Sequence, residues 1–111
     1  MDWFGNEVYL TEETWTTHIV IEHPEMIGCE TIVQQALQDP AEILESTLYS
    51  HGAVFATPAG TGPGVQGIRA VVSYGEISYQ KGASTGKIAT AYPIDVIKYG
   101  RPHVGRPLFK K

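Results

Sequence analysis

The first 68 residues of this chain contain no lysine or arginine. They carry ten carboxylates, whereas residues 69–111 carry all eight basic side chains and only two carboxylates. The mild net charge of −4 therefore conceals an acidic half and a basic half. Because local charge sets the field at a site, the second half favours an anionic partner although the net charge does not. A solvated acidic helical layer facing a basic tail explains the same pattern without a partner.

Cysteine is almost absent as well. Cys29 is the only one, which excludes an intramolecular disulfide and a cysteine-rich zinc site. A small apolar thiol in the core is a simpler interpretation of Cys29 than a nucleophile. No apolar run approaches the ~20 residues that a membrane span needs, and residues 1–3 do not resemble the start of a signal peptide. We expect a cytoplasmic protein with no membrane partner.

Common catalytic motifs are also missing. The Gly- and Pro-rich segment 57–64 does not end in the Lys-Ser/Thr pair of a phosphate-binding P-loop. The Gly-x-Ser-x-Gly spacing occurs at 82–86, but in an expected Gly- and Ser-rich turn between two strands, not in the strand-to-helix turn that exposes a nucleophilic serine. A metal site built from His18, Glu22 and His23 has neither the His-Glu-x-x-His spacing nor further ligand clusters elsewhere. We therefore expect no metal and no cofactor.

The order of the expected elements predicts the fold class. Thr11 is a suitable N-cap for a helix that ends near Pro24. Apolar residues at helical spacing predict a second helix that ends before Pro40. Strand patterns lie at 8–10, 43–49, 53–56, 68–77 and 86–92. Helices first and then a small, mostly antiparallel sheet predict an α+β domain.

The end of the chain has a different composition. It contains Gly-Arg-Pro twice, at 100–102 and 105–107, and finishes with Lys110-Lys111. The glycines and prolines favour an extended conformation over a helix. We expect a single domain over residues 1–99 and an extended basic C-terminal arm over residues 100–111.

The densest potential chemistry lies in residues 17–25. His18 and Glu22 are four residues apart and share one face of the expected helix. A partly buried histidine beside a carboxylate titrates near neutrality and serves as a general acid or base. Structural explanations exist too: His18 closes the edge of the core with one hydrogen bond, and His23 complements the dipole at the helix C-terminus.

A second polar group lies in residues 81–93. Its hydroxyls and cations together suit a phosphate, which needs donors and positive charge around its oxygens. Strict alternation along the expected strand groups Ile88, Thr90 and Tyr92 on one face. Lys87 then lies on the other face.

Three short motifs resemble a known nuclease superfamily. They are His-Ile-x-x-x-His-Pro-Glu at 18–25, Asp-Pro-x-x-Ile at 39–43 and Thr-Ala-Tyr-Pro at 90–93. Over residues 8 to 97 the chain resembles the phage-associated members of the barnase–EndoU–colicin–RelE-like nuclease superfamily. The resemblance implies two N-terminal helices packed on a four-stranded antiparallel sheet. It also implies metal-independent RNA cleavage, often in toxins or phage-encoded effectors.

The resemblance implies catalytic roles for His18, His23 and Thr90. One of the two histidines would take the proton of a ribose 2′-hydroxyl, so that this oxygen attacks the adjacent phosphate. Thr90 would position a phosphate oxygen. The residues leave open which histidine is the base.

The resemblance further implies a basic residue from the sheet that stabilises the phosphate. The candidates are Lys87, Arg69 and Lys81, and the choice between them stays open. Tyr92 or Tyr79 would stack on a base of the RNA. The implied partners are RNA and, for a toxin-like protein, a cognate inhibitor or a phage protein.

Two other functions remain open. The small number of cations favours a non-enzymatic binding module on the same fold. The repeated Gly-Arg-Pro of the arm resembles the hooks that some proteins insert into the minor groove of DNA.

Overall fold

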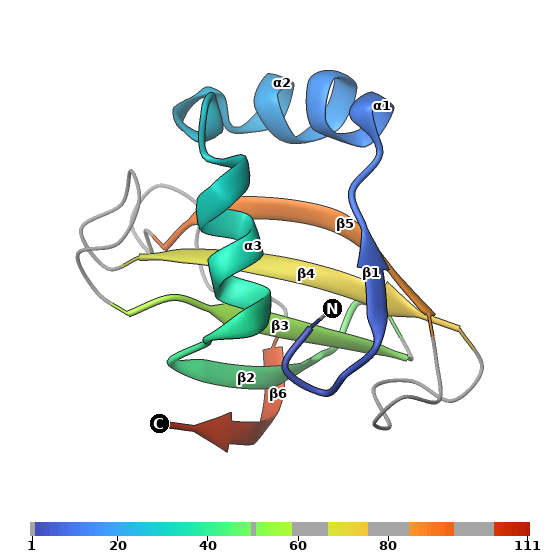
Figure 1. Cartoon of the computed structure of the whole chain (residues 1–111), viewed down its shortest axis with the longest axis vertical. Helices are drawn as coiled ribbons and strands as arrows, with labels where there is room; N and C mark the ends of the chain where they lie inside the picture. The colour runs from blue at the N-terminus through green and yellow to red at the C-terminus, as the bar shows by residue number, and fades with distance from the viewer. Residues whose placement is uncertain (1, 50, 59–66, 76–84, 95–103) are drawn as a thin grey trace.

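The computed structural model describes residues 2–49, 51–58, 67–75, 85–94 and 104–111. After one short strand the helical segments come first and the other strands of a single mixed sheet follow, so the predicted α+β class is confirmed (Figure 1). The expected sheet of four strands is wrong, because the sheet has six strands in the order β1-β5-β4-β3-β2-β6. The strands are β1 (Glu7–Tyr9), β2 (Glu42–Ser46), β3 (Gly52–Ala56), β4 (Ile68–Tyr74), β5 (Thr85–Pro93) and β6 (Val104–Lys110).

The pairing within the sheet is mostly antiparallel, as the sequence predicts. Strand β1 runs parallel to the start of β5, and the other neighbouring strands pair antiparallel. Since β1 covers only Thr85–Lys87 of β5, the rest of that edge lies next to the first helical segment (Figure 1).

The first helical segment is continuous from Glu12 to Glu22. It consists of α1 (Glu12–Thr14), a π-helical stretch (Trp15–Ile19) and α2 (Val20–Glu22). The Thr11 hydroxyl accepts a hydrogen bond from the Thr14 amide at 3.1 Å, which caps the helix as predicted. The hydroxyls of Thr16 and Thr17 donate to backbone carbonyls four residues earlier, at 2.9 and 2.6 Å. Such bonds loosen a helix and are consistent with the wider π turn here.

A short connection joins this segment to α3 (Glu30–Gln38). Pro24 starts a 3-10 turn (Pro24–Met26), and Gly28 follows with φ +80°, a conformation that side chains with a Cβ rarely adopt. Helix α3 then crosses one face of the sheet (Figure 1).

The main core lies between α3 and this face of the sheet. From α3 it contains Val33, Ala36 and Leu37, and from the sheet it includes Phe55 and Val72. Cys29 belongs to the same core, and burial raises the pKa of its thiol, with the neighbouring Glu30 adding to the effect. A buried, protonated thiol is a packing group, as the sequence suggests.

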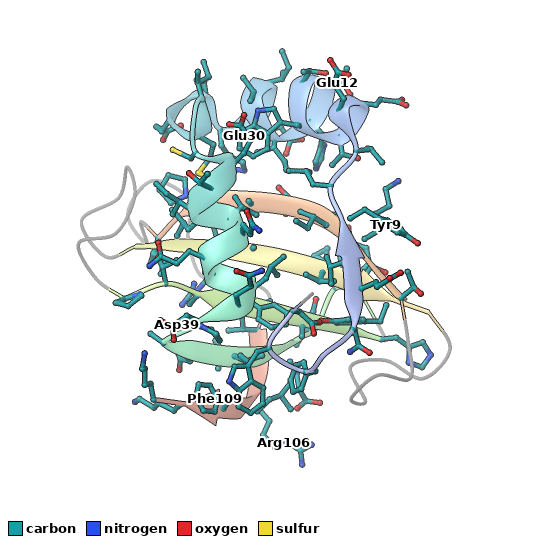
Figure 2. The ribbon with its side chains drawn as sticks, in the orientation of Figure 1. Tyr9, Glu12, Glu30, Asp39, Arg106 and Phe109 are labelled. Atoms are coloured by element: carbon teal, nitrogen blue, oxygen red, sulfur yellow. The ribbon has the colours of Figure 1, made fainter. Side chains whose placement is uncertain are left out.

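Residues 104–110 are extended, as expected for the C-terminal arm, but they belong to the sheet. They form strand β6, which pairs antiparallel with β2 and makes the far edge of the sheet. Lys111 Nζ lies 3.0 Å from Asp39 Oδ1, and Arg106 Nε lies 3.3 Å from Glu45 Oε1. Figure 2 shows Arg106 and Phe109 at this edge, opposite the helical layer that carries Glu12. This part of the basic tail therefore packs on acidic elements of its own chain.

Candidate active site

The face of the sheet opposite α3 carries the candidate site. Residues of β4 alternate: Ile68, Ala70 and Val72 point into the main core, whereas Arg69 and Ser73 point to the opposite side. We call this opposite side the distal face. It has a small apolar patch of its own, made by Leu44, Val54 and Val71.

A β-bulge in β5 decides which side chains reach the distal face. Val71 pairs with Thr90 and Val72 pairs with Ile88, so Ala89 is an extra residue between them. Ile88 therefore joins the core, and the expected grouping of Ile88 with Thr90 is wrong.

Because of the bulge, Lys87 also lies on the distal face, whereas strict alternation predicts that it faces away from Thr90. Lys87 pairs with Ser73, and Tyr92 pairs with Arg69, so both join Thr90 on the distal face. Three of the residues that the resemblance singles out on β5 thus share one surface. Bulges commonly re-aim side chains in this way beside functional sites.

Arg69 and Tyr92 form a polar pair on this face. The Arg69 guanidinium hydrogen-bonds the Tyr92 hydroxyl. Burial raises the pKa of Tyr92, and the positive charge and hydrogen bond of Arg69 offset part of this rise. At neutral pH the Tyr92 side chain is therefore a neutral phenol. No carboxylate of the described residues forms an ion pair with half-buried Arg69, and its Nε atom is buried without a hydrogen-bond partner there.

The Thr90 hydroxyl lies diagonally across from Arg69 on the neighbouring strand. Such diagonal neighbours are roughly 7–8 Å apart between backbones, a separation that a long side chain spans. The Thr90 Oγ1 atom is buried, and none of the described residues hydrogen-bonds it. A buried hydroxyl without a partner costs free energy, so its presence calls for an explanation.

His23 lies against the same surface. Its ring centroid is 5.6 Å from that of Tyr92. The backbone at this position is fixed on both sides, because the His23 amide donates to the Ile19 carbonyl and the His23 carbonyl accepts from the Met26 amide. The turn that Pro24 begins thus holds the imidazole beside Tyr92.

His18 lies elsewhere, in the wall of a cavity between the first helical segment and the distal face. This cavity has a volume of about 520 Å³, and Lys87 lies in its opposite wall. His18 Nδ1 is 3.6 Å from Glu22 Oε1, which confirms that the two share one helix face, although both side chains are about half exposed. Thr90 does not line this cavity.

Sequence reasoning missed several hydroxyls of this cavity. The position of Ser73 could have been predicted from the alternation of β4, because Ser73 lies on the same side of the strand as Arg69. No sequence signal brings Tyr49, between β2 and β3, to the first helical segment. The polar side chains of the wall are Thr11, Glu13, Thr14, Thr17, His18, Tyr49, Ser73 and Lys87.

Two of the expected site residues, Tyr79 and Lys81, lie outside the described residues. Within the part of the chain that the structure describes, no three His, Cys, Asp or Glu side chains are grouped as a metal site requires. The same part contains no helix of the length and hydropathy that crossing a bilayer demands. Comparison with protein-family models, curated proteins and solved structures finds no match to this chain.

Proposed function

We propose that the protein is a metal-independent ribonuclease whose distal face binds the phosphate at which RNA is cut. The observation that carries the proposal is the Arg69 guanidinium, half-buried and without an ion-paired carboxylate among the described residues, next to the buried Thr90 hydroxyl. A cation and a hydroxyl left in this state cost the fold free energy. A phosphate supplies negative charge for the guanidinium and acceptor oxygens for Arg69 Nε and the Thr90 hydroxyl, neither of which has a hydrogen-bond partner among the described residues.

The reaction needs a base, an acid and stabilisation of charge. The base takes the proton of the 2′-hydroxyl, and the 2′ oxygen forms a bond to phosphorus. The bond from phosphorus to the 5′ oxygen of the next nucleotide breaks, and the acid gives that oxygen a proton. The products are a 2′,3′-cyclic phosphate and a 5′-hydroxyl. These steps use protein side chains alone.

The chain offers a group for each role. His18 and His23 exchange the protons, while Arg69, Lys87 and Thr90 face the phosphate oxygens. Neutral Tyr92 donates a hydrogen bond or stacks on a base. A toxin or phage-effector role, with a cognate inhibitor, belongs to the same proposal because it requires the cleavage.

The test compares two arginines. Bulk RNA is incubated with wild type, Arg69→Met and Arg106→Met in the presence of a chelator. Arg106 is the matched control, because it lies at the β6 edge and pairs with Glu45 (Figure 2). Losing one charge-stabilising donor costs ~3 kcal/mol of barrier, so Arg69→Met slows cleavage about 100-fold. Arg106→Met stays close to wild type. An inert wild type, or equal rates for the two variants, contradicts the proposal.

A further inference from the structure

The cavity beside Lys87 is larger than a phosphate site needs. Its volume of about 520 Å³ falls within the roughly 300–1,000 Å³ typical of sites for small organic ligands. One wall comes from the first helical segment and the other from β4, β5 and Tyr49. A site of this size accommodates a nucleoside.

The lining suits a polar, flat ligand. Hydroxyls predominate, contributed by Thr11, Thr14, Thr17, Tyr49 and Ser73. The Thr11 and Thr17 hydroxyls already donate within the helix, to Thr14 Oγ1 and the Glu13 carbonyl, and can still accept a hydrogen bond. A hydroxyl such as that of Tyr49 or Ser73 can both donate and accept, so the wall matches the mixed donors and acceptors of a base edge or a ribose. The Tyr49 ring adds an aromatic surface of the kind on which unpaired bases stack.

The cavity adjoins the proposed phosphate site. Lys87 in its wall and Thr90 are on the same face of β5, and they pair with Ser73 and Val71, two residues apart on β4, so they lie roughly 7 Å apart by the usual rise per residue. Ser73 and Arg69 also share one face of β4. A nucleoside in the cavity is therefore the immediate neighbour of a phosphate held by Arg69 and Thr90.

The two histidines lie at opposite ends of this arrangement. His18 is in the cavity wall near Lys87, and Glu22 is near enough to orient its ring. His23 lies beyond Thr90, against Tyr92. A base must reach the 2′-hydroxyl of the nucleoside, and an acid must reach the oxygen that leaves on the far side of the phosphate.

We propose that the cavity binds the nucleoside whose 3′-phosphate is attacked, with its 2′-hydroxyl facing His18. His18 is then the base and His23 the acid. This assignment rests on the proposed ribonuclease activity and specifies which of the two nucleosides that flank the cut phosphate binds in the cavity. It predicts that a nucleoside 3′-phosphate fits the site and a nucleoside 5′-phosphate does not.

The experiment is an NMR titration of the full chain with uridine 3′-monophosphate, uridine 5′-monophosphate and inorganic phosphate. Thr17→Leu and Thr16→Leu form a matched pair: both residues are exposed and both hydroxyls donate to the carbonyl four residues earlier, but only Thr17 lines the cavity. We expect wild type to bind the 3′-phosphate about tenfold more tightly than either other probe. Thr17→Leu should bind uridine 3′-monophosphate about tenfold more weakly than wild type, and Thr16→Leu should bind it as tightly as wild type. Affinity for inorganic phosphate is unchanged in both variants.

Equal affinity for the 3′- and 5′-phosphates overturns the inference, as does equal binding by Thr17→Leu and Thr16→Leu. The result is separable from the ribonuclease test. If the 3′-phosphate shows the expected pattern but RNA is not cut, the catalytic proposal fails and the cavity is a nucleotide site. If RNA is cut without this pattern, only the cavity assignment fails.

Discussion

At the scale of single residues, a substitution of Thr90 should have different effects on stability and on RNA cleavage. Its buried hydroxyl has no hydrogen-bond partner among the described residues, so Thr90→Val removes a desolvated polar group and keeps the shape. We expect the free energy of unfolding to stay equal or rise by about 1 kcal/mol. RNA cleavage should fall about tenfold or more, because the hydroxyl meets the phosphate only when substrate binds. Urea denaturation and initial cleavage rates measure the two effects.

Thr16→Val is the control for that substitution, since the Thr16 hydroxyl bonds only to the Glu12 carbonyl on the helix surface. It should leave cleavage unchanged. A Thr90→Val protein that unfolds more easily and cleaves normally would show that the hydroxyl serves the fold.

The raised pKa of Tyr74 predicts how the free energy of unfolding depends on pH. Its hydroxyl donates to buried Asp2, and burial together with this hydrogen bond and charge raises the Tyr74 pKa well above its ordinary value of 10.0. The folded protein therefore keeps a proton that the unfolded chain releases at high pH. The stabilisation is complete below about pH 10 and is lost as the pH rises toward the folded pKa.

Tyr74→Phe tests this dependence. At pH 7 the variant should be less stable by about 1–3 kcal/mol, because the buried Asp2 carboxylate loses a donor. Above pH 10 the difference between wild type and variant should shrink. Parallel stability curves from pH 7 to pH 11 would show that the pair does not titrate as described.

At the scale of elements, the bulge in β5 places Lys87 relative to Thr90. Without Ala89 the strand alternates regularly, with Ile88 and Ala91 still in the core and Lys87 still on the distal face. Because Lys87 and Thr90 keep their partners Ser73 and Val71, deleting Ala89 should leave the protein folded and remove the bend and extra twist that the bulge gives the strand between them. Because a misplacement of about 1 Å disrupts a reacting geometry, we expect cleavage to fall at least tenfold.

Deletion of Ala91 is the contrasting variant, since it turns Tyr92 toward the core and should abolish cooperative unfolding. Thermal melts followed by circular dichroism distinguish the two deletions. If the Ala89 deletion cleaves like wild type, the bend that the bulge creates has no role in cleavage.

The first helical segment depends on one buried side chain. Ile19 is fully buried, whereas Ile21 is 69% exposed on the same segment. We expect Ile19→Ala to cost about 2–5 kcal/mol by opening a cavity, and Ile21→Ala to change stability by about 0.5 kcal/mol at most. Denaturant midpoints measure both, and similar costs would contradict the packing described for this segment.

The elements show what the sequence can and cannot reveal. Strong local signals predict the helices and five of the six strands, because caps, prolines and periodicity act on neighbouring residues. Strand β6 was expected to be an extended arm, because its pairing with β2 leaves no local signal. The bulge at Ala89 cannot be predicted from local signals, because Ala89 is an extra residue only relative to the pairing of β5 with β4. For the same reason, strict alternation correctly groups Tyr92 with Thr90 but wrongly adds Ile88 and leaves out Lys87.

At the scale of the whole molecule, the charge asymmetry is partly neutralised within the fold. Lys111 pairs with Asp39 and Arg106 with Glu45, so the C-terminal bases meet the acidic half. These pairs join residues far apart in sequence and were not predictable from composition. Arg69 and Lys87 belong to no such pair among the described residues, so two cations of the distal face have no carboxylate partner there.

The central claim is that the distal face directs a ribose 2′-hydroxyl against its own 3′-phosphate. The most direct measurement incubates the protein, in the presence of a chelator, with the dinucleotide uridylyl-(3′→5′)-adenosine and with its 2′-deoxyuridine analogue, and identifies the products by mass spectrometry. We predict uridine 2′,3′-cyclic phosphate and free adenosine from the first, and no reaction of the second. Cleavage of the deoxy analogue, or no cyclic phosphate from the ribose form, would contradict the account.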